Sequence, residues 1–310
     1  MLWLSYYMGV RIPSWVSSLT NLVKFELNEN RRLQYLPPLN QLPYLKYISL
    51  VKTEALEYIS DEDSVSNMLG GSSSSSKTPF FPSLSSIRLC NFPKLKGWWR
   101  NLDDDENESH HLLLPSFPPC LSNLEIIGCR NLTSMLLFPY FKEKLQLHSS
   151  SWKILEQTMK MGATTSTYFP LSQLEVLVLD HIIDLESLLE EGLQNLVSLR
   201  KLYIERCDGL GSLSLIGILT SLQQLSIWRC PKLMSLPQGI RNLSSLKQLE
   251  INDRPLLRQR CETQAGEDWP IIAHVSCVIV DYENQQEERN SAGMHQSIYL
   301  SFNPKLKINY

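Results

Sequence analysis

The feature that most constrains this chain is a spacing of leucines that recurs, where uninterrupted, every 23 to 25 residues. In the clearest unit the successive gaps are 3, 3, 2, 3, 3 and 3 residues, and its members are Leu219, Leu222, Leu225, Ile227, Cys230, Leu233 and Leu236. The same spacing begins at Leu19, Leu42, Phe81, Leu171, Leu196 and Leu243, with a weaker copy at Leu121. Eight units therefore match one template, which indicates a repeat architecture.

The gaps also predict how each unit folds. The two-residue gap, as between Leu225 and Ile227, is the period of a β-strand, so both side chains point to one side. The three-residue gaps place the other leucines at successive bends of a coil. One coil cannot enclose a core, whereas stacked coils bury a continuous column of leucine. We therefore expect an α/β repeat solenoid, a curved leucine-rich-repeat horseshoe with a parallel sheet on its concave face and a mostly irregular convex side.

The fifth template position holds Asn30, Cys129, Cys207 or Cys230. At a bend the backbone loses its ladder partners, and an amide or thiol side chain can replace them. The seven cysteines contain no close C-x2-C pair, so we expect reduced, buried thiols and no metal. A redox or metal site at the stacked Cys207 and Cys230 is the alternative.

Three segments interrupt the spacing, at residues 60–78, 100–116 and 137–169. We interpret them as loops leaving the convex side or the rims, where insertions do not break the sheet. The stretch from Trp152 to Met161 has weak helical character. The expected organisation is a partial N-terminal repeat at 1–18, a solenoid of about eight repeats at 19–260, a C-terminal capping segment at 261–282 and a tail of unknown structure at 283–310.

The composition narrows the function. Lys and Arg number 29 against 32 Asp and Glu, a balance that argues against a nucleic-acid binder. No apolar run is long enough for a transmembrane segment. The acidic loop from Asp103 to His111 could ligate a divalent cation, although a solvated polar loop is the commoner identity of such a run. No catalytic motif is present, and the sequence assigns no nucleophile or carboxylate partner to His148, His181, His274 or His295. We therefore expect that the chain is not an enzyme and binds no cofactor.

Several phrases carry a family resemblance. Ile12-Pro13-Ser14-Trp15 leads into Leu19-Thr20-Asn21-Leu22, Cys230-Pro231-Lys232-Leu233 precedes Leu236-Pro237, and Gly266-Glu267-Asp268-Trp269 is followed by Ile272-Ala273-His274. In these the chain resembles the leucine-rich-repeat region of plant intracellular nucleotide-binding leucine-rich-repeat disease-resistance proteins of the coiled-coil class. The resemblance implies a cytoplasmic recognition module for plant defence. It would bind a pathogen effector or a guarded host protein and contact a nucleotide-binding domain outside this sequence.

Other functions compete with this interpretation. A substrate-receptor repeat domain of a ubiquitin ligase would need an F-box-like helical segment, which does not precede Leu19. A cell-surface ectodomain would need paired-cysteine caps, and a non-functional truncated paralogue is a further alternative. The first coil shows no polar cap, so we expect the chain alone to aggregate.

Strand alternation predicts a binding strip on the concave face. It turns Lys201, Tyr203 and Glu205 outward in one repeat and Gln224, Ser226 and Trp228 outward in the next. Register sets Glu205 beside Trp228, with Asp180 and Asn252 on the flanks, and Arg206 and Arg229 follow at the strand ends. Tyr, Trp and Arg are the residues of interface hot spots. The predicted partner-binding residues are Lys201, Tyr203, Glu205, Arg206, Trp228 and Arg229. The alternative is that Trp228 packs over a neighbouring side chain and the charges only solvate the face.

Overall fold

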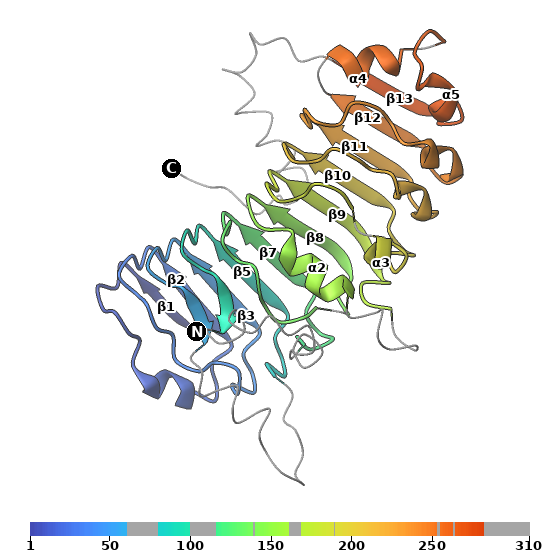
Figure 1. Ribbon diagram of the computed structural model, residues 1–310. Coiled ribbons are helices and arrows are strands. Elements are labelled where there is room, and N and C mark those ends of the chain that lie inside the picture. Colours follow the sequence, from blue (N-terminus) through green and yellow to red (C-terminus); the bar gives the residue numbers. More distant parts are fainter. Residues whose placement is uncertain are drawn as a thin grey trace.

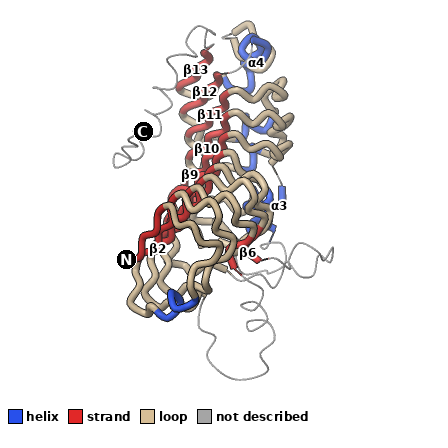
Figure 2. Tube along the Cα trace, turned by 90° about the vertical axis from the view of Figure 1, so that its left-hand side faces the viewer, coloured by secondary structure: helices blue, strands red, loops and turns tan. Residues whose placement is uncertain are grey.

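The computed structural model describes residues 1–60, 80–99, 116–138, 140–160, 169–188, 190–252, 255–262 and 264–281. In this part of the chain the main strands are β1 (Leu2–Ser5), β2 (Lys24–Asn28), β3 (Tyr47–Val51), β5 (Ser86–Cys90), β7 (Asn123–Ile127), β8 (Glu143–His148), β9 (Leu174–Asp180), β10 (Lys201–Glu205), β11 (Gln224–Trp228), β12 (Gln248–Asn252) and β13 (Cys277–Asp281). They form one parallel sheet in chain order (Figure 1). The strands line the concave side of an arc, with the coils behind them (Figure 2).

Short elements cover the rest of each coil. The helices are α2 (Lys153–Lys160), α3 (Glu190–Leu193), α4 (Pro255–Arg260) and α5 (Trp269–Ile272), and the 3-10 helices are η1 (Ser14–Ser18), η5 (Ile216–Ile218) and η6 (Gln238–Asn242). A second, two-stranded parallel sheet pairs β4 (Tyr58–Ser60) with β6 (Gly97–Trp99). The predicted fold class, a leucine-rich-repeat solenoid, is confirmed by this arrangement.

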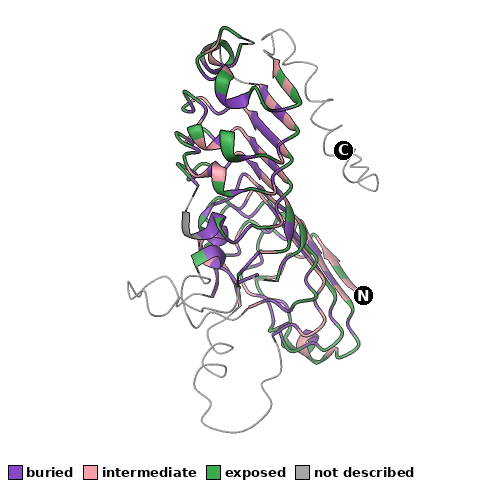
Figure 3. Cartoon of the chain, turned by 90° about the vertical axis from the view of Figure 1, so that its right-hand side faces the viewer, coloured by how far each residue is buried: buried purple, intermediate pink, exposed green. Residues whose placement is uncertain are grey.

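The core follows the predicted register. Leu225 of β11 lies beside Leu249 of β12, and Ile227 lies beside Ile251. Leu225 and Ile227 are fully buried, and the same inward positions are buried along most of the sheet (Figure 3). Each coil thus shares its leucine layer with the next, as the repeat template requires.

The residue after each main-sheet strand from β1 to β11 has a left-handed backbone conformation that few side chains adopt at no cost. At Arg206 and Arg229 φ is 51°, and at the equivalent Glu29 it is 55°. This conformation turns the N–H toward the next coil, so Arg206 N donates to the Trp228 carbonyl at 2.8 Å and Arg229 N to that of Asn252 at 2.9 Å. The ladder therefore continues one residue beyond each main-sheet strand from β1 to β11, and the side chains of these residues form a row along one rim.

The fifth template position satisfies the backbone as the sequence predicted. Asn30 accepts a hydrogen bond from Tyr7 N at 2.7 Å and donates to the Leu4 carbonyl at 3.3 Å. The Cys207 thiol donates to the Glu205 carbonyl at 3.4 Å, and Cys230 makes the same contact with Trp228. Burial raises the pKa of Cys129 and Cys207 to about 12, so both remain neutral thiols.

The interpretation of residues 137–169 as one inserted loop is wrong in part. Residues 143–148 form strand β8, which pairs with β7 and β9, and α2 follows it, in agreement with the weak helical character seen in the sequence. Phenylalanines replace the expected leucines, and the gap from Phe141 to Leu145 is four residues instead of three. Glu143 takes a φ of 59°, and the β8–β9 register shifts between Glu143 and Lys144. Residues 161–168 lie outside the described residues.

The C-terminal segment does more than cap the solenoid, because β13 extends the sheet beside β12. Asp268 is buried, and its hydrogen bonds hold the turn that precedes α5 and β13. Its Oδ2 accepts a hydrogen bond from Leu236 N at 2.9 Å, and its Oδ1 accepts one from Arg260 Nη2 at 2.8 Å.

With β1, β8 and β13, the described sheet holds more strands than the eight template units predicted. The interruptions at 60–78 and 100–116 fall almost wholly outside the described residues, as does the tail at 283–310.

Candidate protein-interaction surface

The structure brings the predicted strip together on the concave face. Glu205 pairs in register with Trp228 and, on its other side, with Asp180, while Trp228 is flanked by Asn252. Lys201 and Tyr203 lie on the same face of β10, and Arg206 and Arg229 follow the strand ends. The predicted register is therefore confirmed, whereas partner binding by these residues stays a prediction.

Hydrogen bonds to neighbouring strands hold the centre of this strip. The Tyr203 hydroxyl donates to Gln224 Oε1 at 3.1 Å, and burial raises its pKa, with the charge of Glu250 acting in the same direction. Ser226 lies on the concave side but is covered, and its hydroxyl donates to Glu250 Oε2 at 2.8 Å. Tyr203 is thus half-buried with its hydroxyl group held by Gln224, and Ser226 offers little surface.

Trp228 is half-buried. It is therefore neither fully exposed nor fully packed over a neighbouring side chain, as the alternative interpretation expected. Its Nε1 atom is covered and has no hydrogen-bond partner among the described residues. A sealed indole N–H cannot donate to a partner unless the ring moves. Any contribution of Trp228 to binding therefore comes from the apolar part of the ring.

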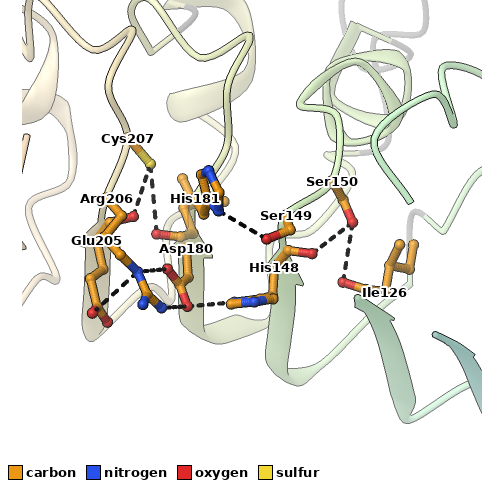
Figure 4. Close-up of polar contacts among 10 residues, drawn as sticks. Ile126, His148, Ser149, Ser150, Asp180, His181, Glu205, Arg206 and Cys207 are labelled. Carbon is orange, nitrogen blue, oxygen red and sulfur yellow. Dashed lines mark hydrogen bonds and ion pairs between the residues drawn. The ribbon is translucent and has the colours of Figure 1, made fainter. Parts of the chain in front are cut away.

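A polar network that the sequence did not reveal lies beside the strip (Figure 4). Arg206 donates from Nε to Asp180 Oδ1 at 2.9 Å and from Nη2 to Oδ2 at 2.7 Å, the fork geometry of a strong guanidinium–carboxylate pair. His148 Nδ1 lies 2.5 Å from the same Oδ2. His148 lies on β8, a strand that the leucine spacing did not predict. Its carboxylate partner could therefore not be predicted either.

Asp180 is the most buried charged residue of this network, with 2% of its surface exposed. Burial alone would raise the pKa of its carboxyl group. Hydrogen bonds and positive charge from His148 and Arg206 outweigh burial and lower that pKa from 3.8 to about 2. The carboxylate is therefore ionised at any physiological pH, and it fixes the Arg206 side chain.

The histidine contacts correct the expectation that His148 and His181 lack partners, but they do not form a catalytic relay. Ser149 Oγ lies 3.1 Å from His181 Nδ1, whereas Asp180 contacts His148 (Figure 4). A nucleophile–base–acid relay needs the serine and the carboxylate on one imidazole. Here they bind different histidines, so this geometry does not activate Ser149.

Other kinds of site find no support in the part of the chain that the structure describes. No group of three His, Cys, Asp or Glu residues there could hold a metal ion, and none of its helices is long and apolar enough to cross a membrane. The acidic loop from Asp103 to His111 lies outside the described residues. Cys207 and Cys230 are buried in the core, and neither forms a disulfide.

An open groove of about 570 Å³ follows the rim where strands β8 to β12 begin. Most of its walls are polar, and the lining residues are Lys142, Glu143, Gln173, Glu175, Val197, Ser198, Arg200, Ser221, Gln223 and Ser245. Ligand pockets are mostly apolar and enclosed, with a few convergent polar groups. This groove is instead a wide polar surface that continues the concave face.

The fold and this surface define a leucine-rich-repeat protein with an open concave face. Residues 1–53 and 183–254 match the sequence model of the R13L1/DRL21 leucine-rich repeats. The chain is 30% identical, over 298 residues, to a protein of Solanum bulbocastanum described as disease resistance protein RGA4. That match covers 86% of this chain but only 27% of the relative. The resemblance to the repeats of plant disease-resistance proteins is thereby confirmed.

A solved leucine-rich-repeat protein from Leptospira interrogans is also similar. It is 17% identical, with a TM-score of 0.24, over 100% of this chain and 95% of the solved chain. The fold assignment rests on the strand register of the present structure.

Proposed function

We propose that the chain is the protein-recognition module of a plant immune receptor that acts in the cytoplasm without catalysis. Its concave face would bind a pathogen effector or a guarded host protein. The observation that carries the proposal is that Tyr203 and Trp228 lie on the open face of the neighbouring strands β10 and β11, with Arg206 directly after β10. The similarity to a disease-resistance protein over most of the chain supports the biological setting.

The fixed geometry of the strip suits recognition. Binding costs free energy when long side chains must be ordered at the interface. Arg206 is already held by two hydrogen bonds to Asp180, and Tyr203 by one to Gln224. These residues therefore lose little conformational entropy on binding, which favours the strip over the freely exposed side chains of the rims.

Truncation of Trp228 tests the proposal. Trp228→Ala should leave folding nearly intact and weaken binding of a partner isolated with the chain from plant tissue by about 2 kcal/mol or more. The affinity is measured beside the thermal midpoint of unfolding. Trp15→Ala is the matched control, because Trp15 is exposed on η1, away from the strip. Unchanged affinity in Trp228→Ala, or an equal loss in Trp15→Ala, would remove Trp228 from the site.

A further inference from the structure

We propose that the concave face recognises an acidic segment of its partner protein. This inference rests on the proposed function and adds the chemistry of the partner. Four ion pairs on this face and on the rim where its strands end carry it: Lys24 Nζ with Glu26 Oε1 at 2.9 Å, Lys52 Nζ with Glu29 Oε1 at 3.2 Å, Arg88 Nε with Glu125 Oε2 at 3.2 Å and Arg206 Nη2 with Asp180 Oδ2 at 2.7 Å.

In every one of these pairs the cation is the more exposed partner. The basic side chains of Lys24, Lys52, Arg88 and Arg206 are 40%, 50%, 33% and 32% exposed, whereas their carboxylates are 23%, 21%, 22% and 3% exposed. The carboxylates of these four pairs are therefore better covered than the cations, and the cations form the outer, positive layer of the pairs. An approaching molecule meets the positive layer first.

Two ion pairs away from this face have exposed carboxylates. The side chains of Lys96 and Glu57 are 52% and 47% exposed, and those of Arg31 and Glu54 are 68% and 53% exposed. The helical pair of Lys160 and Glu156 on α2 comes closer to the concave pattern, with 56% and 25% exposed. The pair of Arg260 and Asp268 near the C-terminal end has 30% and 3% exposed, so a covered acid is not confined to this face. What distinguishes the concave side is that several such pairs follow one another along the sheet.

The remaining groups on the face fit an acidic segment that also carries apolar residues. Lys201 and Arg229 extend the positive layer along β10 and β11, and each is half-buried. Trp3, Tyr6 and Tyr47 are exposed at the N-terminal end of the same face and offer apolar contact. Contacts of exposed charges are screened within about 8 to 10 Å, so the net charge of −3 for the whole chain does not prevent a local attraction.

Protein is the favoured class of ligand over nucleic acid. The cations lie at separate points along the sheet and do not form one continuous basic stripe, whereas the evenly spaced phosphates of a nucleic acid are matched by a continuous stripe. An acidic peptide can place its carboxylates at the separate cations, and the guanidinium groups of Arg88 and Arg206 can bind a second carboxylate.

A pair of synthetic peptides tests the inference on the full chain. One is a short fluorescent peptide of Asp and Glu residues with interspersed Leu, and its twin replaces every acid by the corresponding amide. We expect the acidic peptide to bind roughly tenfold more tightly, with an affinity that falls as salt is raised. Equal affinities for the twins, or tighter binding of a single-stranded RNA of the same length, would overturn the proposal.

Charge reversal locates the binding. Lys24→Glu combined with Lys52→Glu should weaken binding of the acidic peptide by about tenfold or more. Lys96→Glu is the matched control, because Lys96 has nearly the exposure of Lys52 and a pair of nearly the same length, 3.1 Å against 3.2 Å. An equal loss in the control would overturn the proposal. If the isolated partner still depends on Trp228 while the twin peptides bind equally, this inference fails and the proposed function stands.

Discussion

The two ends of the concave face are built on one template and present different chemistry. On β1 to β3, Trp3, Tyr6 and Tyr47 are exposed, and the ion pair of Lys24 with Glu26 lies at the surface. On β8 to β12, the aromatic rings are half-buried, and the Asp180 carboxylate is buried beneath Arg206. The backbone is equivalent at both ends, because Trp3 and Tyr203 occupy the same row of the sheet.

This difference shows that the repeat determines the direction of each side chain but not its burial or its hydrogen bonds. Exposed pairs such as that of Lys24 contribute little to stability because water screens them and the side chains lose entropy. The buried Asp180 has lost its water, so it depends on His148 and Arg206. The N-terminal end should therefore tolerate substitution, whereas the C-terminal end should not.

The largest expected effect should be equal at the two ends, because it concerns the shared core. Leu27→Ala and Leu225→Ala each remove a fully buried side chain and should cost about 2 to 5 kcal/mol of unfolding free energy. Chemical denaturation measures both, and conservative Leu→Met variants at the same positions serve as controls. A cost below about 1 kcal/mol at Leu225 would contradict the assigned register.

A smaller effect should separate the ends. Asp180→Ala leaves the positive charge of Arg206 without its carboxylate partner and should cost about 2 to 3 kcal/mol, whereas Glu26→Ala should cost less than about 1 kcal/mol. Thermal or urea unfolding of both variants checks the contrast. Equal losses of unfolding free energy in the two variants would contradict the expected difference between the two ends.

Acid titration of the same pair of variants is the control. The pKa of Asp180 is lowered from 3.8 to about 2 in the folded state, so its ionised form stabilises the fold above about pH 4. That stability, about 2 kcal/mol, is lost as the pH falls from 4 toward 2. Asp180→Ala should lack this part of the acid dependence, and Glu26→Ala should retain it.

The sequence predicted the fold well because each coil repeats one spacing of buried residues. It failed at β8, where Phe138 and Phe141 replace leucines and one extra residue shifts the spacing before Leu145. It also did not identify β13, whose strand carries valines in place of leucines.

Only those features of the site that follow from strand alternation and strand pairing were predictable. Alternation placed Tyr203 and Trp228 on one face, and pairing placed Asp180 beside Glu205. Neither reveals that Ser226 is covered or that the Trp228 N–H is sealed, because both depend on the rotamers of neighbouring side chains. The hydrogen bonds of His148 depend in addition on a strand that the spacing did not show.

The central claim, that a partner covers the concave face, is tested most directly by hydroxyl-radical footprinting of the chain with and without its bound partner. Tyr203, Trp228 and Trp3 report on the concave face, and the exposed side chains of Trp15 and Met234 report on other surfaces. We predict that partner binding protects Tyr203 and Trp228 from oxidation and leaves Trp15 and Met234 unchanged. Protection confined to Trp15 and Met234 would contradict the claim.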